Sequence, residues 1–264
     1  MRRLTVLLMA AAALLPAADE TRQERAKRVV NEAVQALGGD AFLHMEDRVE
    51  TGRAYSFYRN SISGLSIATI YVRYLPAKPG KVELEERELF GQKQDAGSLL
   101  FTEKGAWDIS FHGARPFDDK RWASYQESTL HNIFYILRQR LNEPGMNLYS
   151  QGTDFYERNP VEVVDITDAE GVTVTVFFDK ITKLPLRQTY RRRNEQFKDF
   201  DTEVTAFAKY RDVKGGIKWP FDVRRERNGE KIYEMYSDSV EINKSPKDSL
   251  FTIPPGTKML PKEQ

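Results

Sequence analysis

The sequence predicts an α+β protein: a large, curved antiparallel sheet that forms an unclosed half-barrel, with helices covering its concave face. Most apolar residues alternate with polar ones, which is typical of antiparallel strands with one solvated face. Two segments, one near the start and one in the middle, instead repeat apolar residues at helical spacing. A sheet with one apolar face needs a cover, and these two helices can provide it.

The N-terminus has the pattern of a cleavable export signal. Two arginines precede an apolar run over residues 4–15, followed by small residues and then by acidic ones. This run is shorter than the roughly 20 apolar residues that a membrane-spanning helix needs. We therefore expect cleavage after Ala17 or Ala18, a signal peptide over 1–18 and a single exported, periplasmic domain over 19–264. An uncleaved N-terminal anchor is the alternative.

The composition narrows the classes of partner. The sequence contains no cysteine, which rules out an N-terminal lipidated cysteine, disulfides and thiolate metal sites. Its 40 lysines and arginines stand against 39 acidic residues, and loss of the two signal arginines leaves 38 against 39. This balance argues against nucleic acid as a partner.

The first helix is expected to begin at Thr21. Thr21 and Glu24 have the spacing of a capping box, in which each side chain bonds the other residue's amide. The apolar stripe behind it consists of Ala26, Val29, Val30, Ala33, Val34 and Leu37. Gly38-Gly39 should end the helix, because glycine adopts the left-handed conformation at little cost.

Strands are expected from about residue 46 to 111, and then the period changes. Asp118 can cap a helix that runs to about Leu141, before the Pro144-Gly145 stop. Its apolar stripe is Trp122, Tyr125, Leu130, Ile133, Phe134, Leu137 and Leu141.

Strands then resume to the C-terminus. One face of the strand near residue 175 carries Val172, Val174, Val176 and Phe178. Asn228-Gly229 is the strongest hairpin signal, because a type I′ turn requires positive φ at both central residues.

Several phrases in the second half of the sequence resemble a known family. They read VFFDKITKLP over 176–185, YRDVKGGIKWP over 210–220 and LFTIP over 250–254. Following an export signal, a first helix ending in Ala-Leu-Gly-Gly and a mid-chain helix, this order resembles the LolA/LolB-like superfamily of periplasmic lipoprotein-localisation carriers and outer-membrane lipoprotein-sorting-like proteins. The resemblance implies an unclosed barrel with a helical lid over an apolar cavity. Some superfamily members shuttle lipid-modified proteins, while others sense or hold such molecules.

Motifs for catalysis and for cofactors are lacking in the sequence. His44, His112 and His131 have no metal-binding spacing, and phosphate-binding loops and nucleophile elbows are absent. We therefore expect no cofactor, no metal, no catalytic residue and no enzymatic activity. The acidic segment 83–88 is interpreted as a solvated strand face or turn. A pair of buried carboxylates in a cavity would instead favour an enzyme.

Aromatic and aliphatic residues of the middle helix and of the later strands can face one interior. An open sheet under a helix often leaves an apolar, ligand-sized gap, although such stripes more often form ordinary core. The predicted cavity lining is Trp122, Phe134, Leu137, Val174, Val176, Phe178, Leu186, Trp219, Phe221 and Tyr236.

Two functional hypotheses follow. The first is a periplasmic binding or carrier protein for a lipid, an acyl chain or a lipid-modified protein. The second is an envelope sensor or interaction module that docks on a membrane complex through the charged segment Arg187 to Asp201. Its basic run at 191–193 can contact anionic headgroups or a partner, or simply form the solvated end of a hairpin.

Overall fold

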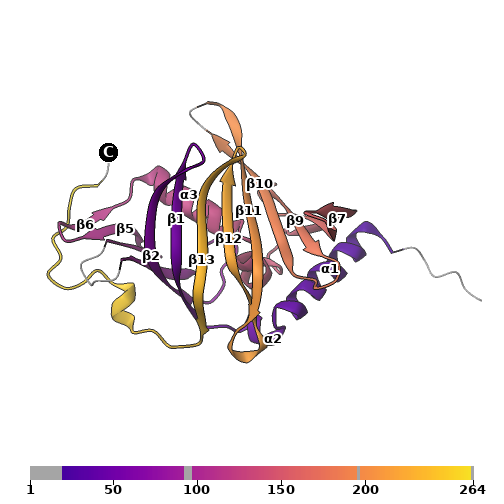
Figure 1. The fold of residues 1–264 in the computed structure, drawn as a ribbon, viewed down its shortest axis with the longest axis horizontal. Helices are drawn as coiled ribbons and strands as arrows, with labels where there is room; N and C mark the ends of the chain where they lie inside the picture. The colour runs from indigo at the N-terminus through magenta and orange to yellow at the C-terminus, as the bar shows by residue number, and fades with distance from the viewer. Residues whose placement is uncertain (1–19, 92–96, 195–196, 263–264) are drawn as a thin grey trace, which may run out of the picture.

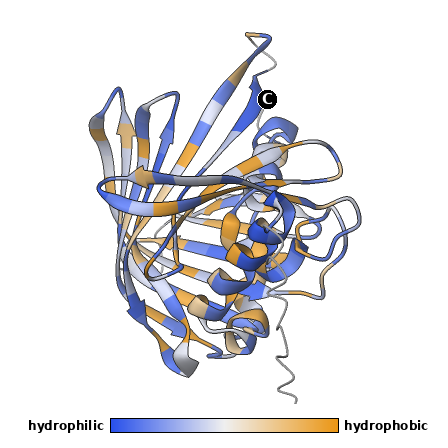
Figure 2. Ribbon diagram, turned by 90° about the vertical axis from the view of Figure 1, so that its right-hand side faces the viewer, coloured by the Kyte–Doolittle hydropathy of each residue, from blue (hydrophilic) through white to orange (hydrophobic). Residues whose placement is uncertain are grey.

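The computed structural model describes residues 20–91, 97–194 and 197–262, so the expected signal peptide lies outside the described residues. The described strands form one antiparallel sheet of 13 strands in the order β6-β5-β4-β3-β2-β1-β13-β12-β11-β10-β9-β8-β7 (Figure 1). The sheet is not closed, because β6 and β7 are both edges. Figure 2 shows it curving around the helices, which confirms the predicted half-barrel.

The strands have the following bounds: β1 Asp47–Tyr58, β2 Ser61–Tyr74, β3 Leu84–Phe90, β4 Ser98–Thr102, β5 Gly105–Ser110, β6 Gly113–Pro116, β7 Asn147–Tyr156, β8 Asn159–Thr167, β9 Thr173–Asp179, β10 Pro185–Asn194, β11 Asp199–Asp212, β12 Lys218–Arg227 and β13 Glu230–Ile242. The helices are α1 Arg22–Leu37, α2 Asp40–Leu43, α3 Asp119–Leu130, α4 Ile133–Tyr135, the π-helix η1 Ile136–Arg140, and the 3-10 helices η2 Lys214–Gly216 and η3 Asp248–Phe251.

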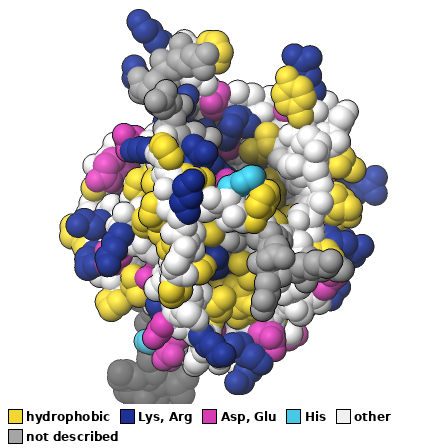
Figure 3. All heavy atoms as spheres, turned by 90° about the vertical axis from the view of Figure 1, so that its left-hand side faces the viewer, with side chains coloured by type: hydrophobic (Ala, Val, Ile, Leu, Met, Phe, Trp, Pro, Cys, Tyr) yellow, Lys and Arg dark blue, Asp and Glu magenta, His cyan; other side chains and the backbone are white. Residues whose placement is uncertain are grey.

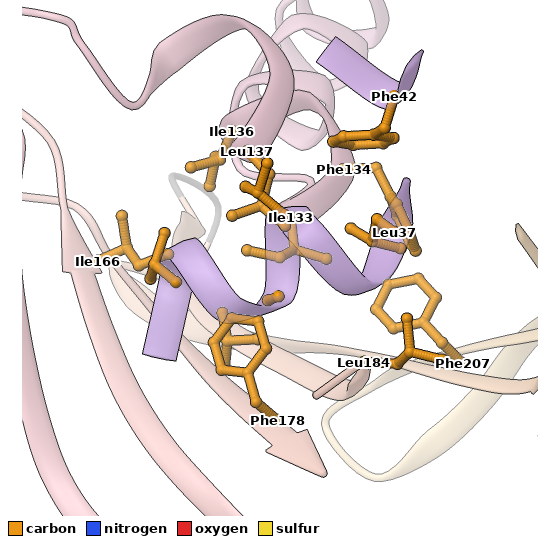
Figure 4. Close-up of a cluster of buried hydrophobic side chains, with 14 of the residues drawn as sticks. Leu37, Phe42, Ile133, Phe134, Ile136, Leu137, Ile166, Phe178, Leu184 and Phe207 are labelled. Atoms are coloured by element: carbon orange, nitrogen blue, oxygen red, sulfur yellow. The ribbon is translucent and has the colours of Figure 1, made fainter. Parts of the chain in front are cut away.

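Helix α1 begins and ends as predicted. The Thr21 side chain accepts a hydrogen bond from the Glu24 amide, and the Glu24 carboxylate accepts one from the Thr21 amide at 2.9 Å. Gly38 has φ 127° and lies against Ile217, where an added Cβ would approach the Ile217 Cα to 3.0 Å. The apolar stripe of α1 is fully buried and packs into the main core with Phe178, Leu137 and other side chains that Figure 4 shows.

The middle helix is not continuous, and the prediction of one helix up to Leu141 is wrong. Helix α3 ends at Leu130, and Asn132 has an extended backbone with φ −78° and ψ 127°. Its side-chain oxygen accepts hydrogen bonds from the amides of Phe134 (3.0 Å) and Tyr135 (3.4 Å). An asparagine that bonds nearby amides in this way competes with the helical ladder and begins a new helix.

The first and last strands meet in the middle of the sheet. Strand β1 pairs with both β2 and β13, and its register with β13 shifts between Thr51 and Gly52. The hairpin between β12 and β13 turns at Asn228-Gly229 with φ 53° and 81°, which confirms the predicted turn.

Candidate functional site: a cavity between the sheet and helix α3

A cavity of about 260 Å³ lies between the sheet and the α3–α4 segment. Strands β1, β2, β3 and β10 to β13 supply its floor. The helical side supplies Tyr125, Ser128, Thr129, Asn132, Phe134 and Tyr135. Of the residues predicted to line a cavity, Phe134 and Trp219 belong to this wall.

One end of the cavity is aromatic. The ring of Phe134 lies 5.0 Å from that of Phe207, edge to face, and 4.8 Å from that of Trp219. All three rings are buried and belong to the cavity wall. Val72 and Leu84 extend this apolar wall on the other side. Such a surface suits a hydrocarbon segment of a ligand.

The opposite wall carries two carboxylates, Glu86 and Glu88. They are two residues apart in β3, so both point into the cavity, and the Tyr125 hydroxyl donates to Glu86 at 3.1 Å. Burial, followed by the neighbouring charge of Glu86, raises the pKa of Glu88 well above its usual range. Within the described residues, no lysine or arginine nitrogen forms a salt bridge with either carboxylate.

The interpretation of segment 83–88 as a solvated face or turn is therefore corrected. It belongs largely to β3, and Leu84, Glu86 and Glu88 line the cavity while Glu83 is buried. The sequence shows that residues 84, 86 and 88 lie on one face of a strand. Their charges do not indicate that α3 covers this face.

Two other carboxylates of the cavity wall, Glu50 and Glu203, are paired with arginines, whereas Arg225 of the wall has no salt bridge among the described residues. Glu50 bonds to Arg48 and accepts a hydrogen bond from Ser237. Glu203 lies 2.7 Å from Arg227 and 3.3 Å from Arg192. Glu86 and Glu88 form no such salt bridge among the described residues, although the positive charges of Arg225 and Arg121 act against the rise in the pKa of Glu88.

On strands β3 and β12, apolar and polar lining residues lie toward opposite ends, whereas β1 departs from this pattern because Arg48 lies 4.7 Å from the centre of the Trp219 ring. Strand β3 begins at Leu84 and carries Glu88 near its other end. That other end lies on the same side of the sheet as the β1–β2 turn. On β12, Trp219 begins the strand, whereas Arg225 lies close to the β12–β13 turn. Along β3 and β12 the cavity is therefore amphipathic, with its polar side chains toward the end of the sheet that carries the β1–β2, β10–β11 and β12–β13 turns.

Helix α3 covers the cavity without a single fully buried side chain. Trp122 and Tyr125 stack at a 5.6 Å centroid distance, and Tyr125 stacks on Phe101 at 3.8 Å. Arg192 of the sheet donates to Ser124. These half-buried contacts hold α3 less firmly than the core holds α1, because elements with few buried contacts open at lower free energy.

The joint between α3 and α4 is fixed to the sheet by Gln188 of β10. The Gln188 side chain accepts from the Ile133 amide at 2.7 Å and donates to the His131 carbonyl at 2.9 Å. His131 also contacts Asp168, with 3.0 Å between Nε2 and Oδ2. A loosely held helix beside a fixed joint has the arrangement of a hinged cover.

The ten residues predicted to line a cavity occupy several environments. Phe134 and Trp219 are in the cavity wall. The main buried core contains Leu137, Val174, Val176, Phe178 and Phe221. Trp122 joins a separate cluster under α3, and Leu186 is half-buried.

Tyr236 lies on the other face of the sheet. Its neighbour Met235 lines the cavity, so Tyr236 points away, where it meets Tyr55 at 6.0 Å and donates to Glu234. The sequence analysis missed Glu86, Glu88 and Tyr125 as lining residues, although all three belong to patterns that it identified.

Similar solved structures share this fold. A putative outer membrane lipoprotein-sorting protein domain from Vibrio parahaemolyticus is 12% identical, with a TM-score of 0.55, over 87% of this chain and 97% of that chain. A DUF1329 family protein from Desulfovibrio piger is 13% identical, with a TM-score of 0.57, over 86% and 97%. The LolA superfamily protein NE2245 from Nitrosomonas europaea is 10% identical, with a TM-score of 0.49, over 86% and 97%.

The first two likenesses confirm the predicted resemblance at the level of the fold: the chain has the lipoprotein-sorting fold. No family model matches the sequence, and no curated protein is significantly similar to it. Among the described residues, no helix is long and apolar enough to cross a membrane.

Proposed function

We propose that this protein binds an amphiphile, a lipid or an acyl chain with its headgroup, in the cavity under α3 and carries it through the periplasm. The observation that carries the proposal is the amphipathic cavity beneath a helix that has no fully buried side chain. The lipoprotein-sorting fold supports it, and the export signal pattern supports the compartment.

The binding energy comes from removal of hydrocarbon from water. Each methylene group that leaves water contributes about 0.8 kcal/mol. The rings of Phe134, Phe207 and Trp219 provide the apolar contact for the tail. The headgroup lies toward Glu86 and Glu88, because contact with a hydrocarbon tail would leave these polar groups without partners.

Entry of a long chain requires α3 to move. Ligand pockets usually enclose about 300–1,000 Å³, and the cavity of about 260 Å³ lies just below this range. Displacement of α3 about the joint at 131–132 enlarges it without disturbing the main core under α1.

The proposal is tested by adding a fluorescent fatty acid to purified protein and by native mass spectrometry of protein extracted from the periplasm. We expect saturable uptake and a bound lipid mass. Thr205→Phe fills the cavity and should abolish uptake. Val204→Phe, on the opposite face of the same strand, is the matched control and should not. Protein that is always ligand-free and takes up no fatty acid contradicts the proposal.

Acid–base chemistry is the second candidate, and one observation favours it. Glu86 and Glu88 form a carboxyl pair in a cavity, and the pKa of Glu88 is raised by burial. A carboxyl group whose pKa is raised in this way can act as a general acid. The same mass spectra separate the two functions, because an intact bound ligand supports binding and a cleaved ligand supports hydrolysis.

A further inference from the structure

Two hairpin tips project from the same end of the molecule. The β1–β2 tip spans Tyr58 to Ile62, and the described residues of the β10–β11 tip are 191–194 and 197–200. Both tips rise at the top of Figure 1. In Figure 3, hydrophobic and basic side chains stand out together at the two upper projections.

The tips carry large apolar side chains that are about half to three-quarters exposed. Tyr58, Ile62, Phe197 and Phe200 are 67%, 63%, 72% and 45% exposed. They do not contribute to any of the buried hydrophobic clusters of the described residues. Apolar side chains gathered on a projecting surface mark a site of interaction.

Basic residues surround these side chains. Arg59 lies over the Tyr58 ring at 5.3 Å, and Arg191 lies over the Phe200 ring at 4.5 Å. In the sequence, segments 58–62 and 191–200 together contain five basic and two acidic residues, whereas the mature chain is nearly balanced. One of the five, Arg192, is paired with Glu203, and the other four still exceed the two acidic residues, so these tips carry net positive charge.

We propose that this end of the protein docks on an anionic phospholipid surface. Aromatic and aliphatic side chains flanked by arginine and lysine match the boundary between headgroups and acyl chains, where apolar tips insert and basic groups meet phosphate. The charge is complementary to an anionic membrane, and two separate tips provide two contacts with one plane.

The docking does not depend on a ligand in the cavity, so it stands apart from the proposed carrier function. The two are nevertheless compatible in geometry. Arg225 and Glu203, polar residues of the cavity wall, lie near the strand ends that lead to the tips of this same end. A protein docked here presents the polar part of its cavity toward the membrane.

The test is flotation of the purified protein with vesicles. One set contains phosphatidylcholine alone and the other a mixture of phosphatidylcholine and phosphatidylglycerol. We expect binding to the mixed vesicles that salt weakens, and little binding to phosphatidylcholine. The double variant Phe197→Ser/Phe200→Ser and the variant Arg191→Glu should each reduce the bound fraction several-fold.

Ile181→Ser is the matched control, because Ile181 is 79% exposed but lies in the turn at the other end of β10. Its binding should equal that of the unchanged protein. Circular dichroism and fatty-acid uptake, which the tip variants should leave intact, show that the fold and the cavity are preserved. Docking is refuted if the unchanged protein does not float with mixed vesicles, or if tip and control variants float equally.

Discussion

Truncation of Trp122 in α3 and of Phe134 in α4 should have different consequences. Phe134 is buried between Phe207 and Trp219, so Phe134→Ala removes a fully packed ring and should cost about 3–5 kcal/mol. Trp122 is half-buried in a helix with no buried side chain. Trp122→Ala should therefore lower the free energy of unfolding by about half as much, about 1.5–2.5 kcal/mol.

Urea unfolding followed by circular dichroism measures both values, since the midpoint shifts while the slope stays constant if the variants remain two-state. Dissociation of a fluorescent fatty acid supplies the second readout. Trp122→Ala should speed dissociation, because the cover over the cavity is weakened. If Trp122→Ala costs as much as Phe134→Ala and leaves dissociation unchanged, α3 is ordinary core and the hinged cover is wrong.

Three further perturbations follow from particular contacts. Gln188→Ala leaves two buried backbone groups at the α3–α4 joint without partners and should cost about 2–5 kcal/mol in thermal unfolding. The pKa of Glu88 is raised in the folded state, so the folded protein keeps this carboxyl protonated up to a higher pH than the unfolded chain does. The free energy of unfolding therefore decreases as the pH rises above about 4.3. Glu88→Gln should therefore raise the melting temperature at neutral pH but not below about pH 4.3. The control Glu230→Gln, at an exposed turn, should leave the melting temperature unchanged at either pH. An equal gain for Glu88→Gln at neutral and at acidic pH would contradict this linkage. Gly52→Ala would place a Cβ 2.2 Å from the Tyr236 carbonyl oxygen and should cost at least about 3 kcal/mol, measured by urea unfolding; an unchanged midpoint would contradict this close approach.

Local patterns predicted the fold class and many of its details. The capping box at Thr21, the glycines after α1 and the Asn228-Gly229 turn all depend on interactions within a few residues. The alternation of β9 placed Val174 and Val176 on the buried face. These features could be predicted because neighbouring residues alone determine them.

The lining of the cavity depends on contacts between distant segments, and the sequence predicted it poorly. The break at Asn132 has a local signal, since asparagine is a good N-cap, but the apolar stripe continues through it. The alternation of β3 places Glu86 and Glu88 on one face, but only the position of α3 over that face makes it a cavity wall. A register shift between β1 and β13, at Thr51 and Gly52, changes the alternation of β13, so Val240 and Ile242 face the core whereas Tyr236 points away from it.

Hydrogen exchange with and without a bound fatty acid tests the central claim, a mobile helix over a ligand cavity, most directly. Amides of α3, from Asp119 to Leu130, should exchange faster than those of β9, from Thr173 to Asp179, because α3 lacks buried side chains. Addition of the fatty acid should slow exchange in α3 and leave β9 unchanged. Equal protection of both segments, unaltered by the fatty acid, would contradict the account.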